Sequence, residues 1–173
     1  MPELVTTRCR LVPITLDAVE AVLRHDRAAA EAAIGAAFPD AWPNDDLVAR
    51  AFPVSLDAIR ADPDVRLWGD SMVLVRDEPR VVGSIVFHGF PPDGIAEVAY
   101  GIEDSSRRQG LAAEATLACV EWALGQPGIR AVQATTFPWH EASLGVIRRL
   151  GMAAAGTRTH DVLGELLVFE RRR

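Results

Sequence analysis

The order of strand-like and helix-like segments between residues 72 and 150 restricts this chain to a mixed α/β fold. β-branched and aromatic residues dominate residues 72–75, 81–87 and 95–102, and turn-forming residues separate the runs, which predicts three antiparallel strands. Residues 110–124 carry an apolar helical face that stops before Gly125. A strand at 131–137 and a helix at 141–150, closed by Gly151, are predicted to follow.

The flanking segments add to this pattern. Residues 7–14 predict a first or edge strand ending at Pro13, residues 16–37 one or two helices, and the proline-rich residues 38–63 short helices with loops. Residues 152–159 and 162–171 predict a closing hairpin, and the run 170–173 a solvated tail. We expect a single domain over residues 1–173, with a mostly antiparallel sheet flanked by helices.

Charge and composition exclude several classes of protein. All 18 cationic residues are arginine, so Schiff-base chemistry, a pyridoxal phosphate anchor and a P-loop lysine are excluded. The net charge of −6 disfavours nucleic acid and anionic membranes and suits cationic or amine-bearing partners. Cys9 and Cys119 give no disulfide framework or zinc ribbon, and no apolar run reaches transmembrane length, so we expect a soluble cytoplasmic protein.

The loop between the third strand and the long helix has the composition of a phosphate-binding loop. It reads Ser105-Ser106-Arg107-Arg108-Gln109-Gly110-Leu111-Ala112. Backbone N–H groups at a helix N-terminus have no partner within the helix and lie at its positive end, so they bind phosphate oxygens, and small residues let a ligand approach. A pyrophosphate would fit there. The alternative is a solvated turn with a helix-entry glycine.

Arg107-x-x-Gly110-x-Ala112 resembles the Gln/Arg-x-x-Gly-x-Gly/Ala signature of the GCN5-related N-acetyltransferases (GNAT), in their acetyl-CoA pyrophosphate loop. The resemblance extends through residues 83–85, 97–102, 113–115 and 137–152. Residues 6–11 are similar to the RimJ/RimL-like branch, which acetylates N-termini of ribosomal proteins. Residues 17–70 match this family only in length and in general composition.

The resemblance implies that the strands around 97–102 and 131–137 splay apart and that pantetheine lies between them. It then implies an acetyl-CoA site formed by Val98, Ala99, Tyr100, Arg107, Arg108, Gln109, Gly110, Leu111, Ala112, His140 and Ser143, with no metal. The sequence departs from the family at Arg108, where glycine is frequent, and at His140, where asparagine is frequent. His140 could contact pantetheine, act on the acceptor, or cap the following helix.

The family's tyrosine proton donor is missing from the helix after residue 140, and Ser143 is similar in position to the serine of the RimL-like group. We therefore expect Ser143 to protonate the leaving thiolate; otherwise it is a first-turn capping hydroxyl. Glu97 could relay the acceptor's proton through water, or it could pair with an arginine. His88 could line the acceptor side, although a strand-end surface histidine is the simpler interpretation.

These residues predict an acetyl-CoA-dependent N-acetyltransferase in which a neutral amine attacks the thioester directly. The alternative is a non-catalytic acyl-CoA-binding module; a Rossmann oxidoreductase is excluded because GxGxxG is absent. Residues 26–64 contain eight acids and three arginines, which predicts a cationic acceptor, either a peptide N-terminus or a small polyamine-like or aminoglycoside-like molecule. An ordinary solvated face is the alternative. A homodimer is one expectation for the assembly.

Overall fold

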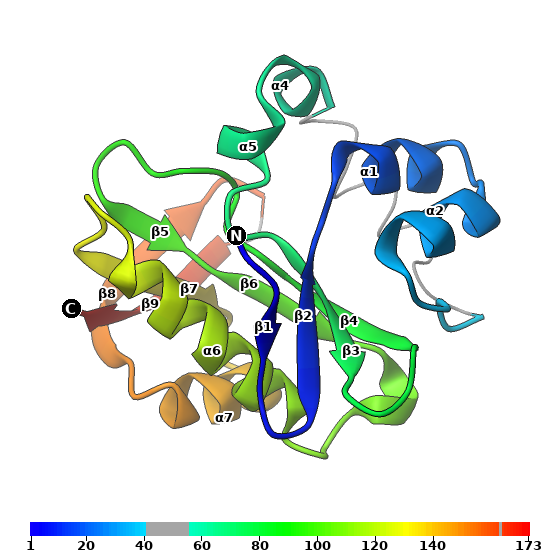
Figure 1. Cartoon of the computed structure of the whole chain (residues 1–173). Coiled ribbons are helices and arrows are strands. Elements are labelled where there is room, and N and C mark those ends of the chain that lie inside the picture. Colours follow the sequence, from blue (N-terminus) through cyan, green and yellow to red (C-terminus); the bar gives the residue numbers. More distant parts are fainter. Residues whose placement is uncertain (41–55, 163) are drawn as a thin grey trace.

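The computed structural model describes residues 1–40, 56–162 and 164–173, and its strands form two sheets (Figure 1). The five-stranded sheet has the order β1-β2-β3-β4-β6 and the four-stranded sheet the order β5-β7-β9-β8. The strands are β1 Leu4–Val5, β2 Cys9–Pro13, β3 Ser71–Val75, β4 Val81–Val86, β5 Ile95–Glu97, β6 Ala99–Ile102, β7 Ala131–Thr136, β8 Ala153–His160 and β9 Gly164–Arg172. The mixed α/β fold predicted from the sequence is confirmed.

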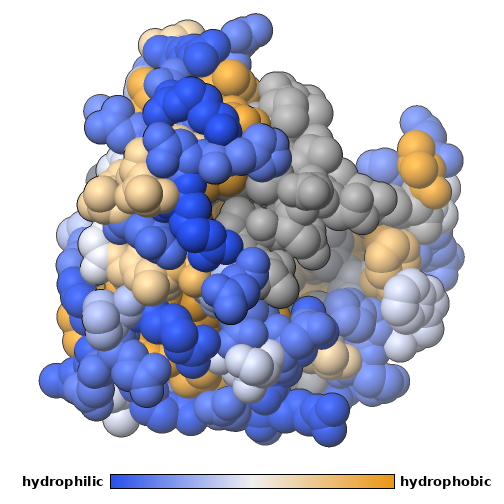
Figure 2. Space-filling view, turned by 90° about the vertical axis from the view of Figure 1, so that its right-hand side faces the viewer, coloured by the Kyte–Doolittle hydropathy of each residue, from blue (hydrophilic) through white to orange (hydrophobic). Residues whose placement is uncertain are grey.

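The first two helices begin at residues that supply side-chain caps. Thr15 and Asp26 accept backbone N–H groups at the starts of α1 and α2, and Gly35 ends α2 in the left-handed conformation. The helices are α1 Leu16–Leu23, α2 Arg27–Ile34, α4 Leu56–Ala61, α5 Pro63–Arg66, α6 Leu111–Gly125 and α7 Glu141–Arg149, with a short 3₁₀ turn η2 at Asp104–Ser106. Seen from the side of α1 and α2, the surface is mainly hydrophilic (Figure 2).

The five-stranded sheet separates two apolar clusters because successive strand residues point to opposite faces. On β3, Val73 packs into the cluster under α6, while Met72 and Leu74 pack into the cluster under α1 and α2. The apolar face predicted for residues 110–124 is the buried face of α6, with Ala115 and Cys119 fully buried. Helices therefore cover both faces of this sheet.

The region expected to form one strand over residues 95–102 is two strands that belong to different sheets. β6 pairs antiparallel with β4, whereas β5 pairs in parallel with β7. Between them the N–H of Val98 donates to the carbonyl of Gln133 at 2.8 Å. The chain changes partners at Val98, and β6 and β7 diverge beyond it, as the family resemblance implied.

Two smaller expectations are corrected. The strand expected at residues 7–14 is β2, and it is neither the first strand nor an edge strand. It pairs with β1 on one side and with β3 on the other. The run 170–173 is not a solvated tail: β9 continues to Arg172, and Arg172 pairs in register with Ala131 of β7. Of the stretch 38–63, where short helices were expected, the described part holds α4, and α5 begins at its last residue, Pro63. Residues 41–55 lie outside the described part.

In the ranges that the structure describes, no helix combines the length and apolar character needed to cross a bilayer.

Buried Asp70 holds the chain where β4 ends. Its carboxylate accepts the backbone N–H of Phe87 at 2.7 Å, and the residue is only 5% exposed. Burial raises the pKa of Asp70 to about 7, although the hydrogen bond from Phe87 and the charge of Arg66 act in the opposite direction. The protein therefore buries an acid whose charge is costly at neutral pH.

Asp70→Asn should remove a pH dependence of stability. The folded protein holds this proton more tightly than the unfolded chain, so the contribution of Asp70 is complete below the ordinary pKa of 3.8 and is lost as pH rises through about 7. The variant should thus gain stability relative to the unaltered protein between these pH values. Urea unfolding at several pH values measures the difference, with exposed Asp77→Asn as the control; a pH-independent difference for Asp70→Asn would contradict the assignment.

Candidate functional site

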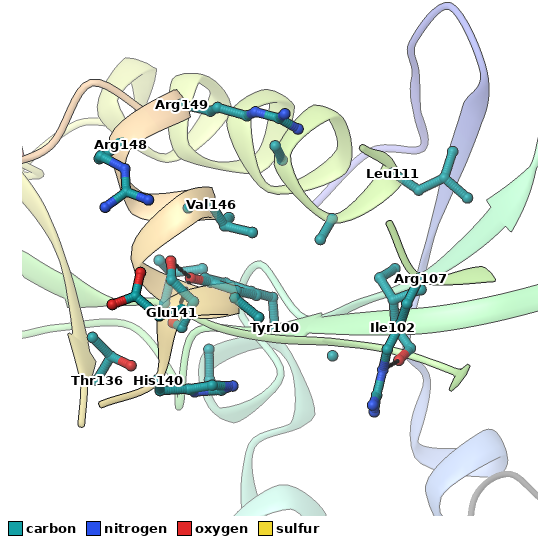
Figure 3. A pocket seen from close by; sticks show the side chains of 18 of the residues that line it. Tyr100, Ile102, Arg107, Leu111, Thr136, His140, Glu141, Val146, Arg148 and Arg149 are labelled. Atoms are coloured by element: carbon teal, nitrogen blue, oxygen red, sulfur yellow. Dashed lines mark hydrogen bonds between the residues drawn. The ribbon is translucent and has the colours of Figure 1, made fainter. Parts of the chain in front are cut away.

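A cavity of about 1190 Å³ opens where β6 and β7 diverge. Its walls come from residues 97–102, the C-terminal end of β7, the loop 106–110, the first turn of α6, and α7. Residues far apart in the sequence meet there, because α7 follows β7 directly and α6 follows the loop after β6 (Figure 3). The cavity is large enough for an extended small molecule.

The first turn of α6 reaches the cavity without a side-chain cap. Gly110 is the N-cap residue, with φ of +82° in the left-handed region, and it has no side chain that could cap the first N–H groups of the helix. Gly110, Leu111, Ala112 and Ala113 all line the cavity. The free N–H groups and the positive end of the helix dipole make this turn a site for an anion.

The loop before α6 is held by its own side chains. Arg107 donates from Nε to the carbonyl of Ile102 at 2.9 Å and pairs with Asp104 at 2.7 Å, so its guanidinium shapes the loop while lining the cavity. Arg108 has φ of +60°. A glycine, which the resemblance implies is frequent at this position, would adopt this left-handed conformation without strain.

Glu103 anchors the start of this loop. Its carboxylate accepts from the hydroxyls of Ser105 and Ser106 and pairs with Arg80 at 3.1 Å. The hydrogen bond from Ser106, with those from Ser105 and Arg80, lowers the pKa of Glu103 to about 2. Glu103 therefore stays ionised at neutral pH and ties the loop to Arg80, the residue immediately before β4.

Additional arginines surround Gly110. Arg8 donates to the carbonyl of Gln109 at 2.7 Å and pairs with Glu114 at 2.7 Å. A side chain at Gly110 would meet Arg8 Nη2 at 3.3 Å and Arg149 Nη1 at 3.6 Å. Figure 3 shows Arg149 reaching from α7 toward the first turn of α6. The anion site thus has guanidinium groups from two further elements.

Ser143 forms a hydroxyl pair with the only tyrosine of the chain. Ser143 Oγ lies 2.9 Å from Tyr100 Oη, and Tyr100 Oη lies 3.2 Å from the Ser143 carbonyl, to which it can donate. Burial raises the pKa of Tyr100, an effect that the hydrogen bond to Ser143 only partly offsets, so the phenol stays protonated. The partner of Ser143 Oγ is therefore a side chain of β6 that also lines the cavity.

Two other polar side chains lie near this pair. Thr136 is 5% exposed and lines the cavity, and its hydroxyl has no hydrogen-bond partner within the described part of the chain. Buried hydroxyls normally have a partner, so Thr136 indicates a position for a polar ligand atom. His140 is the N-cap residue of α7, but its side chain makes no capping hydrogen bond.

Glu97 also lines the cavity and is engaged by two side chains. Oε1 accepts from Thr135 and from Arg158, both at 2.8 Å, and Oε2 accepts from Arg158 at 3.2 Å. Burial alone would raise the pKa of Glu97, but these hydrogen bonds together with the charge of Arg158 lower it. Glu97 is therefore an ionised, arginine-paired carboxylate.

The cavity brings together almost all of the residues selected from the sequence. The residues predicted from the sequence that line it are Glu97, Val98, Ala99, Tyr100, Arg107, Arg108, Gly110, Leu111, Ala112, His140 and Ser143, whereas Gln109 is not among the lining residues. Sequence reasoning missed Thr136, Arg148 and Arg149, which also line it. Two adjacent arginines at the end of a helix, Arg148 and Arg149, are a sequence signal for an anion-binding position. No sequence signal indicates that the Thr136 hydroxyl has no partner.

Within residues 1–40, 56–162 and 164–173, no cluster of three or more His, Cys, Asp or Glu side chains is placed to hold a metal ion.

Comparisons with known proteins agree on one family. The family model described as acetyltransferase (GNAT) domain matches residues 8–153. The uncharacterized N-acetyltransferase YjdG of Bacillus subtilis is 25% identical over 130 residues, which cover 75% of this chain and 76% of YjdG.

Solved structures show the same fold. A GNAT-family acetyltransferase from Bordetella pertussis superposes with a TM-score of 0.67 at 23% identity and covers 99% of each chain. RimL, a ribosomal L7/L12 α-N-protein acetyltransferase in complex with CoA, superposes with a TM-score of 0.67 at 15% identity and covers 98% of this chain and 96% of RimL.

Proposed function

Because this chain belongs to the acetyltransferase (GNAT) family, we propose that the cavity between β6, β7, α6 and α7 is its acetyl-transfer site. The family resemblance inferred from the sequence is confirmed, and the chain is an N-acetyltransferase that transfers an acetyl group to an amine. The comparisons give no support to the alternative of a non-catalytic acyl-CoA-binding module. The observation that carries the proposal is the convergence of an anion site and a proton-donating hydroxyl pair in one cavity.

The residues of the cavity fit acetyl-CoA, the co-substrate of this family. The uncapped turn at Gly110, with Arg8 and Arg149 beside it, suits the pyrophosphate. The buried Thr136 hydroxyl without a partner suits an amide group of pantetheine between β6 and β7. When bound, acetyl-CoA supplies the acetyl group as a thioester.

Ser143 is the proposed proton donor to the departing sulfur. If Tyr100 donates to Ser143 Oγ, the hydrogen of the serine hydroxyl is free to point into the cavity, and the accepted hydrogen bond makes that hydroxyl a better donor. A thiol has a pKa of about 8.5, so the thiolate needs only a weak acid. Tyr100 thus supports Ser143 from the strand, in place of a tyrosine on the helix.

The acceptor amine must be neutral when it attacks. At about 1.36 kcal/mol per pKa unit, an α-amino group of pKa about 7.7 to 8.0 costs roughly 1 kcal/mol to neutralise at pH 7, whereas a lysine amine costs more than 4 kcal/mol. This difference favours N-terminal amines or small amines of low pKa. Glu97, which is ionised and lines the cavity, would attract the cationic form and could hold a water for a proton relay.

Gly110→Glu should abolish acetyl-CoA binding because it places a carboxylate beside the pyrophosphate position. Stabilisation by a ligand scales as RT ln(1 + [L]/Kd), so the rise in Tm caused by acetyl-CoA should disappear. Gly35→Glu is a matched control: Gly35 also has positive φ and ends a helix, but no atom lies within 4 Å of its added Cβ. An unchanged ligand-induced rise in Gly110→Glu would disprove the cofactor placement.

Ser143→Ala should lower kcat at least tenfold while leaving the Kd for CoA nearly unchanged, because general acid catalysis contributes about 10²- to 10⁴-fold. Tyr100→Phe should give a smaller loss, since it removes the supporting hydroxyl but keeps the donor. Steady-state kinetics with CoA titration separates the two effects. If Ser143→Ala kept its kcat and only lost stability, Ser143 would have a structural role.

We further propose that the acceptor is a cationic amine, either a peptide N-terminus or a small polyamine-like or aminoglycoside-like molecule. The net charge of −6 supports this, as does the acidic segment that includes α5, whose end contacts the loop after β4. In the described part of that segment, Asp26 and Asp62 also cap helices, and none of its acids lines the cavity. Any steering is therefore long-range.

Thiol release from acetyl-CoA should be fastest with cationic members of a panel that contains alanyl-arginine amide, spermidine, an aminoglycoside, and neutral and acidic peptides. The rate should fall as salt rises, because charges are screened beyond about 8 to 10 Å. Turnover restricted to neutral or anionic amines, or rates that do not change with salt, would refute the charge preference without affecting the family assignment.

A further inference from the structure

The loop after β4 places His88 on the wall of the cavity that contains Glu97 and Tyr100. The backbone of His88 has φ of +59°, which is uncommon for a residue with a side chain. Such conformations persist where the surrounding structure enforces them, and they concentrate at functional sites. His88 therefore needs an explanation beyond that of a surface residue at a strand end.

The chain is fixed on both sides of His88. Before it, the N–H of Phe87 is held by the buried carboxylate of Asp70 at 2.7 Å. After it, the N–H of Phe90 donates to the carbonyl of Val65 in α5 at 2.9 Å. The indole of Trp68 packs edge-on against both phenyl rings, with centroids 5.4 and 5.5 Å away. The backbone of His88 is thus held rigidly at the cavity.

Charged groups from two neighbouring elements act on His88. Glu97 of β5 favours the imidazolium form, and Arg66 of α5 disfavours it; Arg158 of β8 acts indirectly through its pair with Glu97. Burial is the largest influence and lowers the pKa of His88 below its ordinary 6.5, although the residue is exposed and lines the cavity. At neutral pH, the imidazole therefore has a lone pair available.

Glu97, the acid selected from the sequence, is less suited to accept a proton. Both of its oxygens already accept hydrogen bonds from Thr135 or Arg158, and its pKa is lowered. Its negative charge can instead stabilise a positive charge that forms on His88. Glu97 and His88 thus differ in role: one supplies a fixed charge, and the other supplies the lone pair.

We propose that His88 is the group that takes the proton from the acceptor ammonium, with Glu97 stabilising the resulting imidazolium. This inference rests on the proposed acetyl-transfer function of the cavity. One N–H bond of the ammonium breaks and its proton moves to the imidazole nitrogen, which leaves a lone pair on the amine. That lone pair forms the N–C bond as the C–S bond breaks, and the sulfur takes a proton from Ser143. The amine nitrogen then loses its second proton, which restores the Ser143 hydroxyl through water, and His88 later releases its proton to water.

The test compares His88→Asn with the unaltered protein by measuring kcat/KM against pH at saturating acetyl-CoA, with the fastest amine of the panel above. Asparagine tolerates positive φ but cannot act as a base. In the unaltered protein, kcat/KM should be constant at pH values between the pKa of His88 and the pKa of the amine. In His88→Asn, kcat/KM should continue to rise tenfold per pH unit up to the pKa of the amine.

The kcat/KM of His88→Asn should therefore be at least tenfold below that of the unaltered protein near pH 6.5. The difference should shrink at pH values where the amine is already neutral. His25→Asn is the matched control, because His25 also has positive φ, at +56°, and does not line the cavity. A uniform loss at all pH values, or a profile identical to that of the unaltered protein, would overturn the proposal. So would a loss of the plateau in His140→Asn instead of His88→Asn.

Imidazole rescue gives a second readout. His88→Gly relieves the backbone strain and leaves room for free imidazole, so added imidazole should restore turnover, while His25→Gly should not respond. Failure of rescue in a variant that still shows the acetyl-CoA-induced rise in Tm would count against His88 alone. Absence of turnover by the unaltered protein with every amine of the panel would instead count against the proposed function.

Discussion

The segment from Ile95 to Ile102 divides its hydrogen bonds between two sheets, and the rest of the site depends on that division. Its first half pairs with β7 and its second half with β4, and the N–H of Val98 makes the hydrogen bond to Gln133 at the point of separation. Gly83 allows the close approach on the β4 side, since a Cβ there would collide with the carbonyl of Gly101. The cavity exists because two well-paired sheets leave a wedge between them.

The exclusive use of arginine shapes the chemistry of that wedge. A guanidinium can donate several hydrogen bonds at once in a fixed plane. Arg107 uses this to hold a carbonyl and a carboxylate of its own loop, and Arg8 links the carbonyl of Gln109 with Glu114. Some arginines at the mouth of the cavity are thus structural braces as well as positive charges, a distinction that residue type alone does not reveal.

The sequence was informative where a local pattern determines the outcome. The apolar face of α6, the helix-entry Gly110 and the order of strands and helices could all be predicted, because spacing and backbone conformation are local properties. The change of sheet at Val98 could not, since it depends on which distant strands lie beside it. Nor could the meeting of Tyr100 with Ser143, or the inward placement of His88, because each requires the loops to be placed in three dimensions.

The two apolar clusters on opposite faces of the five-stranded sheet have a consequence for local unfolding. The helices α1 and α2 pack in one cluster, whereas α6, with the loop before it, depends on the other. Separate packing allows one cooperative unit to open while the other stays closed. The amides of α1 and α2 can thus exchange hydrogen without exposing the amides of α6. Evolution could likewise exchange these outer helices, and with them one face of the molecule, without rebuilding the phosphate-binding turn.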